Sequence, residues 1–348
     1  MKRTIIMAWR NIWRNKRRTL ITIASIFFAV FFAVLMRSFQ IGTYDHMIHQ
    51  AIESYSGYIQ IQDKYFFDEP SLDNSMQYNT ELVSQLASIE NIKIAVPRIE
   101  SFALASTGNQ SKGVIVTGID PQKEEFLSNP ENTIVRYRFT PEVVAKIMAE
   151  TQLSDKQKNM ATSLDKQSYS SLSRISLDLD FSKKQEKEIF PIIEKYASFQ
   201  GQYLTAHDDG VLISDRLSKY LKAQVGDTII LMGGGYQGRS ASGLFAVRGI
   251  VKVLSPELDN KLVYMTLEKA QEFFSMDGRI TSLNLNLNAP DEMDKTSEKI
   301  KSKILSEQYT VKTWEEFNPT LKQQIEGDSI GGVIFIGILY FIVFFGII

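Results

Sequence analysis

Two uncharged apolar runs lie at opposite ends of the chain, separated by a long stretch of mixed polarity. The first runs from Leu20 to Met36 and is closed by Arg37, and the second runs from Ile330 to Ile348 with neither charge nor proline. At 1.5 Å of helical rise per residue, each is nearly long enough to cross a hydrocarbon core about 30 Å thick. The pattern predicts transmembrane helices at 19–37 and 330–348. The second has no flank on its far side, which makes the chain look incomplete.

The segment before the first run has an amphipathic helical pattern. Ile5, Trp9, Ile12 and Trp13 recur at spacings of three and four residues, which places them on one helix face. We expect residues 1–18 to form a cytoplasmic interfacial helix with its aromatic side in the leaflet. The predicted membrane-interface anchors are Trp9, Trp13, Arg14, Arg17 and Arg18.

Helical spacing also continues on the inner side of each run. It predicts a stalk helix over 38–56, ended by Gly57, and a second stalk over 318–329 that starts with Pro319 in its first turn. Two helical stalks would join the membrane to the central segment, and such a layout can transmit force. The residues that carry the pattern are Tyr44, Met47, Ile48, Leu321 and Ile325.

The central segment, 57–317, alternates predicted strands and helices. Near its start, GYIQIQ reads as a strand, NTELVSQLASIENI as a capped helix and KIAVPRIESFALA as a strand, and the far end repeats this style. We infer an α+β core with two ferredoxin-like (porter) halves, and an inserted small β-rich subdomain at 210–255. Residues 130–200 are rich in Lys, Gln and Ser and predict a variable, mostly helical insertion.

Charge is distributed unevenly along the chain. Seven positive residues and no acidic ones precede the first apolar run. Because the formal net charge of the whole chain is −1, the remaining residues carry a net charge of −8. This bias predicts a cytoplasmic amino terminus and a periplasmic (extracytoplasmic) core in a multi-pass protein of the inner (plasma) membrane. A cleaved signal peptide has a shorter apolar core, so an uncleaved anchor is favoured. The acidic remainder argues against nucleic acid as a partner, and without cysteine there are no disulfides.

Three stretches give the chain a family resemblance. VTGIDPQKE at 116–124, GVLISDRLSKYLKAQVGDTIIL at 210–231 and FAVRGIVKV at 245–253 lie, in this order, between the two apolar runs. This arrangement resembles ABC-transporter permeases of the lipoprotein-releasing and macrolide-exporter type, with a MacB-like periplasmic core domain and an FtsX-like organisation. Such permeases have four spans, so the resemblance implies that the last two spans and the ATPase-coupling loop are missing. Residues 130–200 depart from the family pattern.

The resemblance implies a function without catalysis on this chain. Two permeases, identical or homologous, would bind cytoplasmic ABC ATPase subunits, which hold the ATP and Mg²⁺, and ATP-driven closure would move the outer domains through the stalks. This mechanotransmission would serve lipoprotein release from the inner membrane, or export of a periplasmic substrate. A lateral opening for lipid-anchored cargo would be lined by Phe27, Phe28, Phe31 and Phe32, which could equally face plain lipid.

Three stretches match patterns of ligand-binding or catalytic sites, but each is better explained by a structural role. GGGYQG at 233–238 satisfies a dinucleotide-binding pattern, but no helix pattern follows it, which favours a hairpin loop. His46, His49 and Glu53 could share a helix face and hold a metal, but they read as a solvated stalk. His207 and its two aspartates form a polar turn. We therefore expect no catalytic, cofactor or metal site on this chain.

A two-span receptor is the competing class, with a sensory outer domain that reports to a cytoplasmic signalling domain. The charge bias and the stalks fit it equally well. The mixed α+β core with VGDTIIL and the amphipathic amino-terminal helix favour the permease, and a membrane-anchored enzyme has no motif in its favour.

Overall fold

The computed structural model describes residues 14–51, 56–151, 153–304 and 307–347. Within the helix ends, the side chains of 45, 46, 49–51, 346 and 347 are outside this description. The chain divides into two compact units, Met1–Ala51 with Glu315–Ile348, and Ile52–Trp314.

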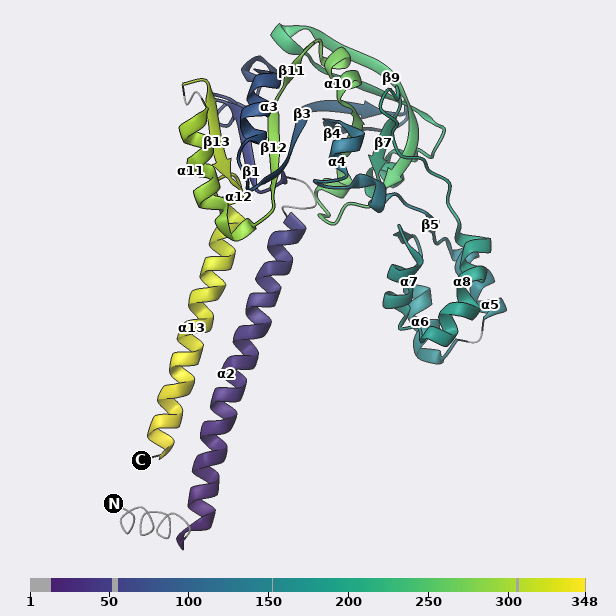
Figure 1. The fold of residues 1–348 in the computed structure, drawn as a ribbon. Helices are drawn as coiled ribbons and strands as arrows, with labels where there is room; N and C mark the ends of the chain where they lie inside the picture. The colour runs from purple at the N-terminus through teal and green to yellow at the C-terminus, as the bar shows by residue number, and fades with distance from the viewer. Residues whose placement is uncertain (1–13, 52–55, 152, 305–306, 348) are drawn as a thin grey trace. The chain divides into compact units, whose positions relative to one another are not determined.

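The first unit is a pair of long helices. α2 (Lys16–Ala51) and α13 (Pro319–Ile347) run side by side in opposite directions (Figure 1). Both are long and apolar enough to cross a membrane by length and composition. α2 continues without a break from the apolar run through the predicted stalk residues, and α13 begins with the proline that the sequence places in its first turn.

One part of the second unit is a four-stranded antiparallel layer built from both ends of the central segment. Its strands lie in the order β13-β1-β12-β3. Along the chain this is a β-α-β unit followed, far downstream, by a second one, which is the ferredoxin-like arrangement with its halves interleaved. The elements are β1 (Ile59–Asp63), α3 (Thr80–Ala87), β3 (Ile92–Ser106), β12 (Ser282–Leu287), α11 (Met293–Lys303) and β13 (Tyr309–Thr313). The predicted ferredoxin-like halves are therefore present.

α3 shows why these residues form a helix. The side chain of Asn79 caps it by accepting a hydrogen bond from the Glu81 amide at 2.8 Å. Leu82 and Leu86, four residues apart, are buried against the layer, as the spacing predicts.

The other part of the sheet closes on itself. β3 pairs with β4, and the order continues through β10, β7, β9 and β8, which pairs back with β3. The added strands are β4 (Ser111–Ile119), β7 (Val211–Ser214), β8 (Thr228–Gly234), β9 (Ser240–Val251) and β10 (Leu262–Thr266). The predicted β-rich segment 210–255 supplies β7, β8 and β9, and the other strands of the closed sheet come from outside it. Closure leaves this part without free edges.

The remaining described elements are short. They are η2 (Leu72–Asn74), β2 (Met76–Gln77), α4 (Pro121–Glu124), η3 (Pro130–Thr133), β5 (Tyr137–Arg138), β6 (Ser168–Tyr169), α9 (Asp215–Leu221), η4 (Tyr236–Gly238), η5 (Leu258–Asn260), α10 (Leu267–Phe274), β11 (Arg279–Ile280), η6 (Pro290–Glu292) and α12 (Trp314–Phe317).

The segment GGGYQG is the tip of a hairpin. β8 and β9 pair antiparallel up to Gly234 opposite Ser240, and η4 turns between them, where Gly238 takes a positive φ of 72°. A strand follows, not a helix, so the hairpin prediction is confirmed and the geometry of a dinucleotide site is absent here.

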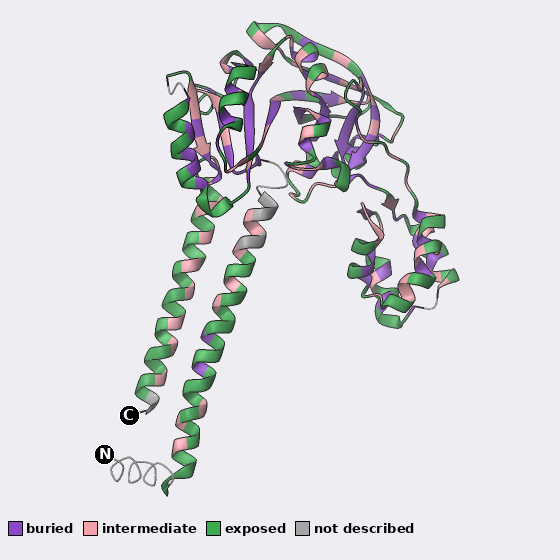
Figure 2. Cartoon of the chain, in the orientation of Figure 1, coloured by how far each residue is buried: buried purple, intermediate pink, exposed green. Residues whose placement is uncertain are grey.

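The predicted insertion is a small helical bundle with a core of its own. Its helices are α5 (Pro141–Glu150), α6 (Asp155–Ser163), α7 (Leu172–Leu179) and α8 (Lys183–Ala197). Ser154 and Ser182 each form a capping box with a glutamine three residues later. Ile175 and Ile193 are fully buried in the bundle core. Buried residues gather in this core and in the sheet, whereas α2 and α13 are largely exposed (Figure 2).

Candidate functional site

The contact between α2 and α13 follows a regular stripe on each helix. On α13 the partly buried positions other than Lys322 recur at spacings of four or three residues, which approximates a heptad pattern. They are Leu321, Ile325, Ser329, Gly332, Ile336, Leu339 and Val343. On α2 the most buried positions are Ala29 and Ala33, with 6% and 5% of their surface exposed. Small residues on this face let the helix backbones approach closely.

Polar side chains join the two helices next to this apolar stripe. Gln40 donates from Nε2 to the Asp328 carbonyl at 2.6 Å, and Arg37 donates from Nη1 to Ser329 Oγ at 3.3 Å. Arg37 also donates to Gln40 Oε1 at 3.0 Å, which ties the two contacts together. We call Arg37, Gln40, Asp328, Ser329 and Gly332 the inter-helix clasp.

Gly332 completes the clasp because it has no side chain. A Cβ added at this position would lie 2.5 Å from Gln40 Oε1, whereas one added at Gly331 would meet nothing within 4 Å. The Gln40 amide therefore packs over Gly332. The sequence analysis did not predict the clasp. The available signal was that Arg37 ends one apolar run and Asp328 precedes the other by two residues.

The four phenylalanines proposed as a lateral-gate face do not lie in this contact. Phe27, Phe28, Phe31 and Phe32 expose 60%, 52%, 46% and 53% of their surface. Since successive helical residues are about 100° apart, Phe27 and Phe31 point away from the face of Ala29. The rings stack on one another, with centroids 6.1 Å apart for Phe27 and Phe31 and 6.2 Å for Phe28 and Phe32. Their role in substrate entry stays a prediction.

The other predicted site residues fall into two groups. Among the stalk residues, Leu321 and Ile325 lie on the α13 stripe, and Tyr44, Met47 and Ile48 are partly buried on α2. Among the interface anchors, Arg14, Arg17 and Arg18 are exposed, and the last two belong to α2 itself. Trp9 and Trp13 are outside the described residues, as are Glu53 and the side chains of His46 and His49.

Along the chain, the two helices connect to neighbouring strands. β1 begins eight positions after the end of α2, and β13 ends directly before α12, which leads to α13. β1 and β13 pair antiparallel, with Ile59 opposite Thr313, and the Trp314 amide donates to the Tyr58 carbonyl at 2.9 Å. Both helices are therefore linked to the same edge of the ferredoxin-like layer.

β3 links this layer to the closed sheet, and a buried ion pair marks the junction. Arg98 is opposite Ser282 on β12 and opposite Ile119 on β4, so it belongs to both parts. Its side chain and that of Glu124 are fully buried and form an ion pair, with Arg98 Nε donating to Glu124 Oε2 at 3.2 Å. Burial alone would lower the pKa of Arg98, but the charge and hydrogen bonds of Glu124 raise it above its ordinary value.

A second charged cluster attaches the helical bundle to the core. The fully buried Asp215 at the start of α9 accepts from Ser168 Oγ at 2.8 Å, Arg138 Nη2 at 3.1 Å and Lys219 Nζ at 2.6 Å. Burial would raise the pKa of Asp215, but the hydrogen bonds and charges, chiefly those of Lys219, hold it below its ordinary value. The cluster stabilises an ionised carboxylate between bundle and core.

The polar turn at His207 has no catalytic geometry in the described structure. His207 Nδ1 lies 2.8 Å from Glu268 on an exposed surface, while Asp208 pairs with Arg248 at 2.8 Å and Asp209 with Lys269 at 3.2 Å. Within the described ranges, no cluster of three or more His, Cys, Asp or Glu side chains could hold a metal ion.

Comparisons with solved structures found proteins that are distantly similar to this chain. No family model matches the chain, and no curated protein matches it. The periplasmic region of MacB from Actinobacillus actinomycetemcomitans is similar with 14% identity and a TM-score of 0.40, covering 80% of this chain and 95% of that one. The extracellular domain of the noncanonic ABC-type transporter YknZ from Gram-positive bacteria has 10% identity and a TM-score of 0.38, covering 74% and 100%. Overlap at this level does not establish a function, so the residues described above must support any proposal.

Proposed function

We propose that this chain is the permease subunit of an ABC transporter that works by mechanotransmission. The proposal combines the sequence resemblance with one structural observation. Two helices able to span a membrane are linked to β1 and β13, which are hydrogen-bonded neighbours at one edge of the ferredoxin-like layer. A change in the separation or tilt of the helices would act on the two strands of a single ladder, and so on the whole sheet.

The proposed force path continues from this edge into the closed sheet. β12 and then β3 follow β1 in the sheet, and β3 is a single 15-residue strand shared by both parts. Protein interiors are densely packed and transmit strain, so a hydrogen-bonded sheet with a buried ion pair at its junction is a suitable lever. The clasp would hold the two helices in register at the outer end of the apolar runs.

In this proposal the chemistry takes place on other subunits. A separate cytoplasmic ABC ATPase would bind ATP and Mg²⁺, and a second permease copy or homologue would complete the transporter. The chain would lie in the inner (plasma) membrane with its amino terminus in the cytoplasm and its core outside. Its substrate would be a lipoprotein released from the membrane, or another molecule taken up from the periplasm.

Purification from native membranes tests the subunit assignment. The protein as its cell makes it, carrying an affinity tag, should co-purify with a soluble ATPase that bears a phosphate loop, and the purified 348-residue chain alone should hydrolyse no ATP. Retrieval of a histidine kinase or a methyl-accepting partner instead would identify a receptor.

A further inference from the structure

A cavity of about 630 Å³ lies where the helical bundle meets the core. One wall comes from the bundle, including Tyr169 and Arg174, and the other from the core, including Lys252 and Leu254. Its size falls in the range of small-molecule sites, and it is far larger than one inorganic phosphate needs.

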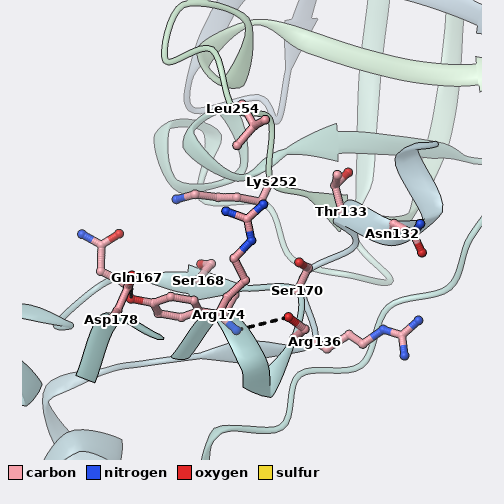
Figure 3. Close-up of a pocket in the computed structure, with 12 residues that line it drawn as sticks. Asn132, Thr133, Arg136, Gln167, Ser168, Ser170, Arg174, Asp178, Lys252 and Leu254 are labelled. Carbon is pink, nitrogen blue, oxygen red and sulfur yellow. Dashed lines mark hydrogen bonds between the residues drawn. The ribbon is translucent and has the colours of Figure 1, made fainter. Parts of the chain in front are cut away.

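Two cationic side chains from different walls point into this cavity. Figure 3 shows the Arg174 side chain extending from α7 toward Lys252, which follows the end of β9. The Arg136 side chain points away from Arg174 and Lys252, and Arg136 also lines a second cavity of about 500 Å³. Like charges that converge on one space repel each other unless an anion lies between them.

The acidic groups nearby do not neutralise Arg174. Asp178, which also lines the cavity, accepts from the Tyr169 hydroxyl at 2.7 Å. Lys252 is 3.7 Å from Asp215, which Lys219 and Arg138 already contact. Across the described part of the chain, the Arg174 guanidinium has no ion-pair partner within 4.0 Å.

Hydroxyl groups line the rest of the polar wall. Ser168, Ser170 and Ser171 follow one another around β6 and the start of α7, and all line the cavity. Ser170 and Ser171 are partly exposed, so they can donate to a ligand. Guanidinium and hydroxyl donors on the bundle wall, with an ammonium donor and the apolar Leu254 on the core wall, match a phosphate ester attached to an organic group.

We propose that this cavity binds the phosphate ester of a small organic molecule, either a soluble metabolite or the headgroup of an anionic phospholipid. Arg174 and Lys252 hold the phosphate from opposite walls, and the Ser170 and Ser171 hydroxyls donate to its remaining oxygens, because the Ser168 hydroxyl already donates to Asp215. This site goes beyond the proposed permease function and does not depend on it, because it rests on the bundle and core alone. Its occupant would bridge the two.

The test measures binding to the 348-residue chain in a neutral detergent by isothermal titration calorimetry. The probes are glycerol 3-phosphate, monomeric dihexanoyl-phosphatidylglycerol and, for comparison, zwitterionic dihexanoyl-phosphatidylcholine and succinate. Binding of either of the first two, weakened by added salt, is expected, and which one binds tells a soluble source from a lipid source.

Variants connect that binding to the cavity. Arg174→Gln should weaken it about tenfold or more, because a hydrogen bond to a charged group is lost, and Arg174→Lys should retain part of it. Lys187→Gln on the exposed face of α8 is the matched control and should bind as the unaltered chain does. Absence of binding by both phosphate probes, equal binding of phosphatidylcholine or succinate, or equal affinity in the Arg174→Gln chain would overturn the proposal.

Discussion

Gln40 on α2 donates a hydrogen bond to the main-chain carbonyl of Asp328 on α13, with 2.6 Å between nitrogen and oxygen. This contact lies at the boundary between each apolar run and the polar helix that follows or precedes it. Apolar side chains gain little by pairing inside lipid, so interhelical hydrogen bonds and small residues set the register there. The clasp therefore defines how the two helices are aligned.

Crosslinking tests this alignment in a chain that has no native cysteine. In the pair Gln40→Cys with Gly332→Cys, a short bis-methanethiosulfonate reagent should link the two positions, because Gly332 faces the Gln40 side chain. Gln40→Cys with Gly331→Cys is the control and should link poorly, since Gly331 is exposed on a different face. Mass spectrometry of the linked peptides measures both yields. Equal yields would mean that the clasp does not fix the helix faces.

The ion pair at the junction of the sheet should be costly to break. Glu124→Ala removes the carboxylate closest to the buried, charged Arg98 and leaves it only the more distant Glu100, 3.6 Å away, so the variant should lower the free energy of unfolding by about 3–5 kcal/mol. The double variant Arg98→Met with Glu124→Leu should recover much of this loss, because neither charge then remains buried. Thermal unfolding of the detergent-solubilised chain measures the effect.

A surface ion pair supplies the control for that experiment. Lys156 and Asp180 are 2.9 Å apart, but their side chains expose 70% and 72% of their surface. Lys156→Ala should therefore change the free energy of unfolding by about 1 kcal/mol or less. If Glu124→Ala is equally mild, the Arg98 guanidinium reaches water and the junction is looser than described.

Acid should loosen the attachment of the helical bundle. The pKa of Asp215 is lower in the folded chain than in the unfolded one, so its carboxylate stabilises the fold above the unfolded pKa of about 4. That contribution is lost as the pH falls through the folded pKa. Asp259 nearby acts in the opposite sense, because burial raises its pKa and its ionised form is disfavoured.

Asp215→Asn isolates the carboxylate. The variant should be less stable than the unaltered chain at pH 7, and the difference between the two should shrink as the pH is lowered from about 5 to about 3. Proteolysis of the bundle over that pH range, followed by gel analysis, measures it. A difference that stays constant with pH would show that Asp215 acts through packing and not through its charge.

Membrane orientation can be tested with single cysteines. Lys16→Cys should be protected from an impermeant thiol reagent in intact cells, and Lys187→Cys on α8 should react. The reason is the basic bias before the first apolar run. Labelling at position 16 from outside would reverse the proposed topology.

Periodicity and capping residues made much of this fold predictable. Asn79 and Ser154 mark helix starts by their side-chain chemistry, and the apolar spacing in α3 identifies its buried face. Long-range pairing was less accessible. Nothing local in Ala103–Ser106 shows that this strand also pairs with β8, because a second partner depends on how the sheet closes.

The candidate site was predictable in its components but not in its contacts. The sequence predicts two apolar helices continued by stalks, and the structure has one long helix over each region, α2 and α13, both long and apolar enough to cross a membrane. The sequence does not show which face of α2 meets α13, since Ala29 and Phe28 are equally compatible with lipid. Gln40 and Gly332 become partners only through the antiparallel register, which no local pattern encodes.

Whether ATP hydrolysis stays coupled to transport when α2 is broken tests mechanotransmission most directly. In the transporter as its cell makes it, reconstituted with its ATPase, Met47→Pro removes a helix hydrogen bond and costs about 3 kcal/mol at an interior position of α2. Met47→Leu is the control, because it keeps the helix and the apolar side chain. The account predicts that the proline variant still binds its ATPase and hydrolyses ATP but loses transport, while the leucine variant transports normally. Normal transport by Met47→Pro would contradict force transmission through this helix.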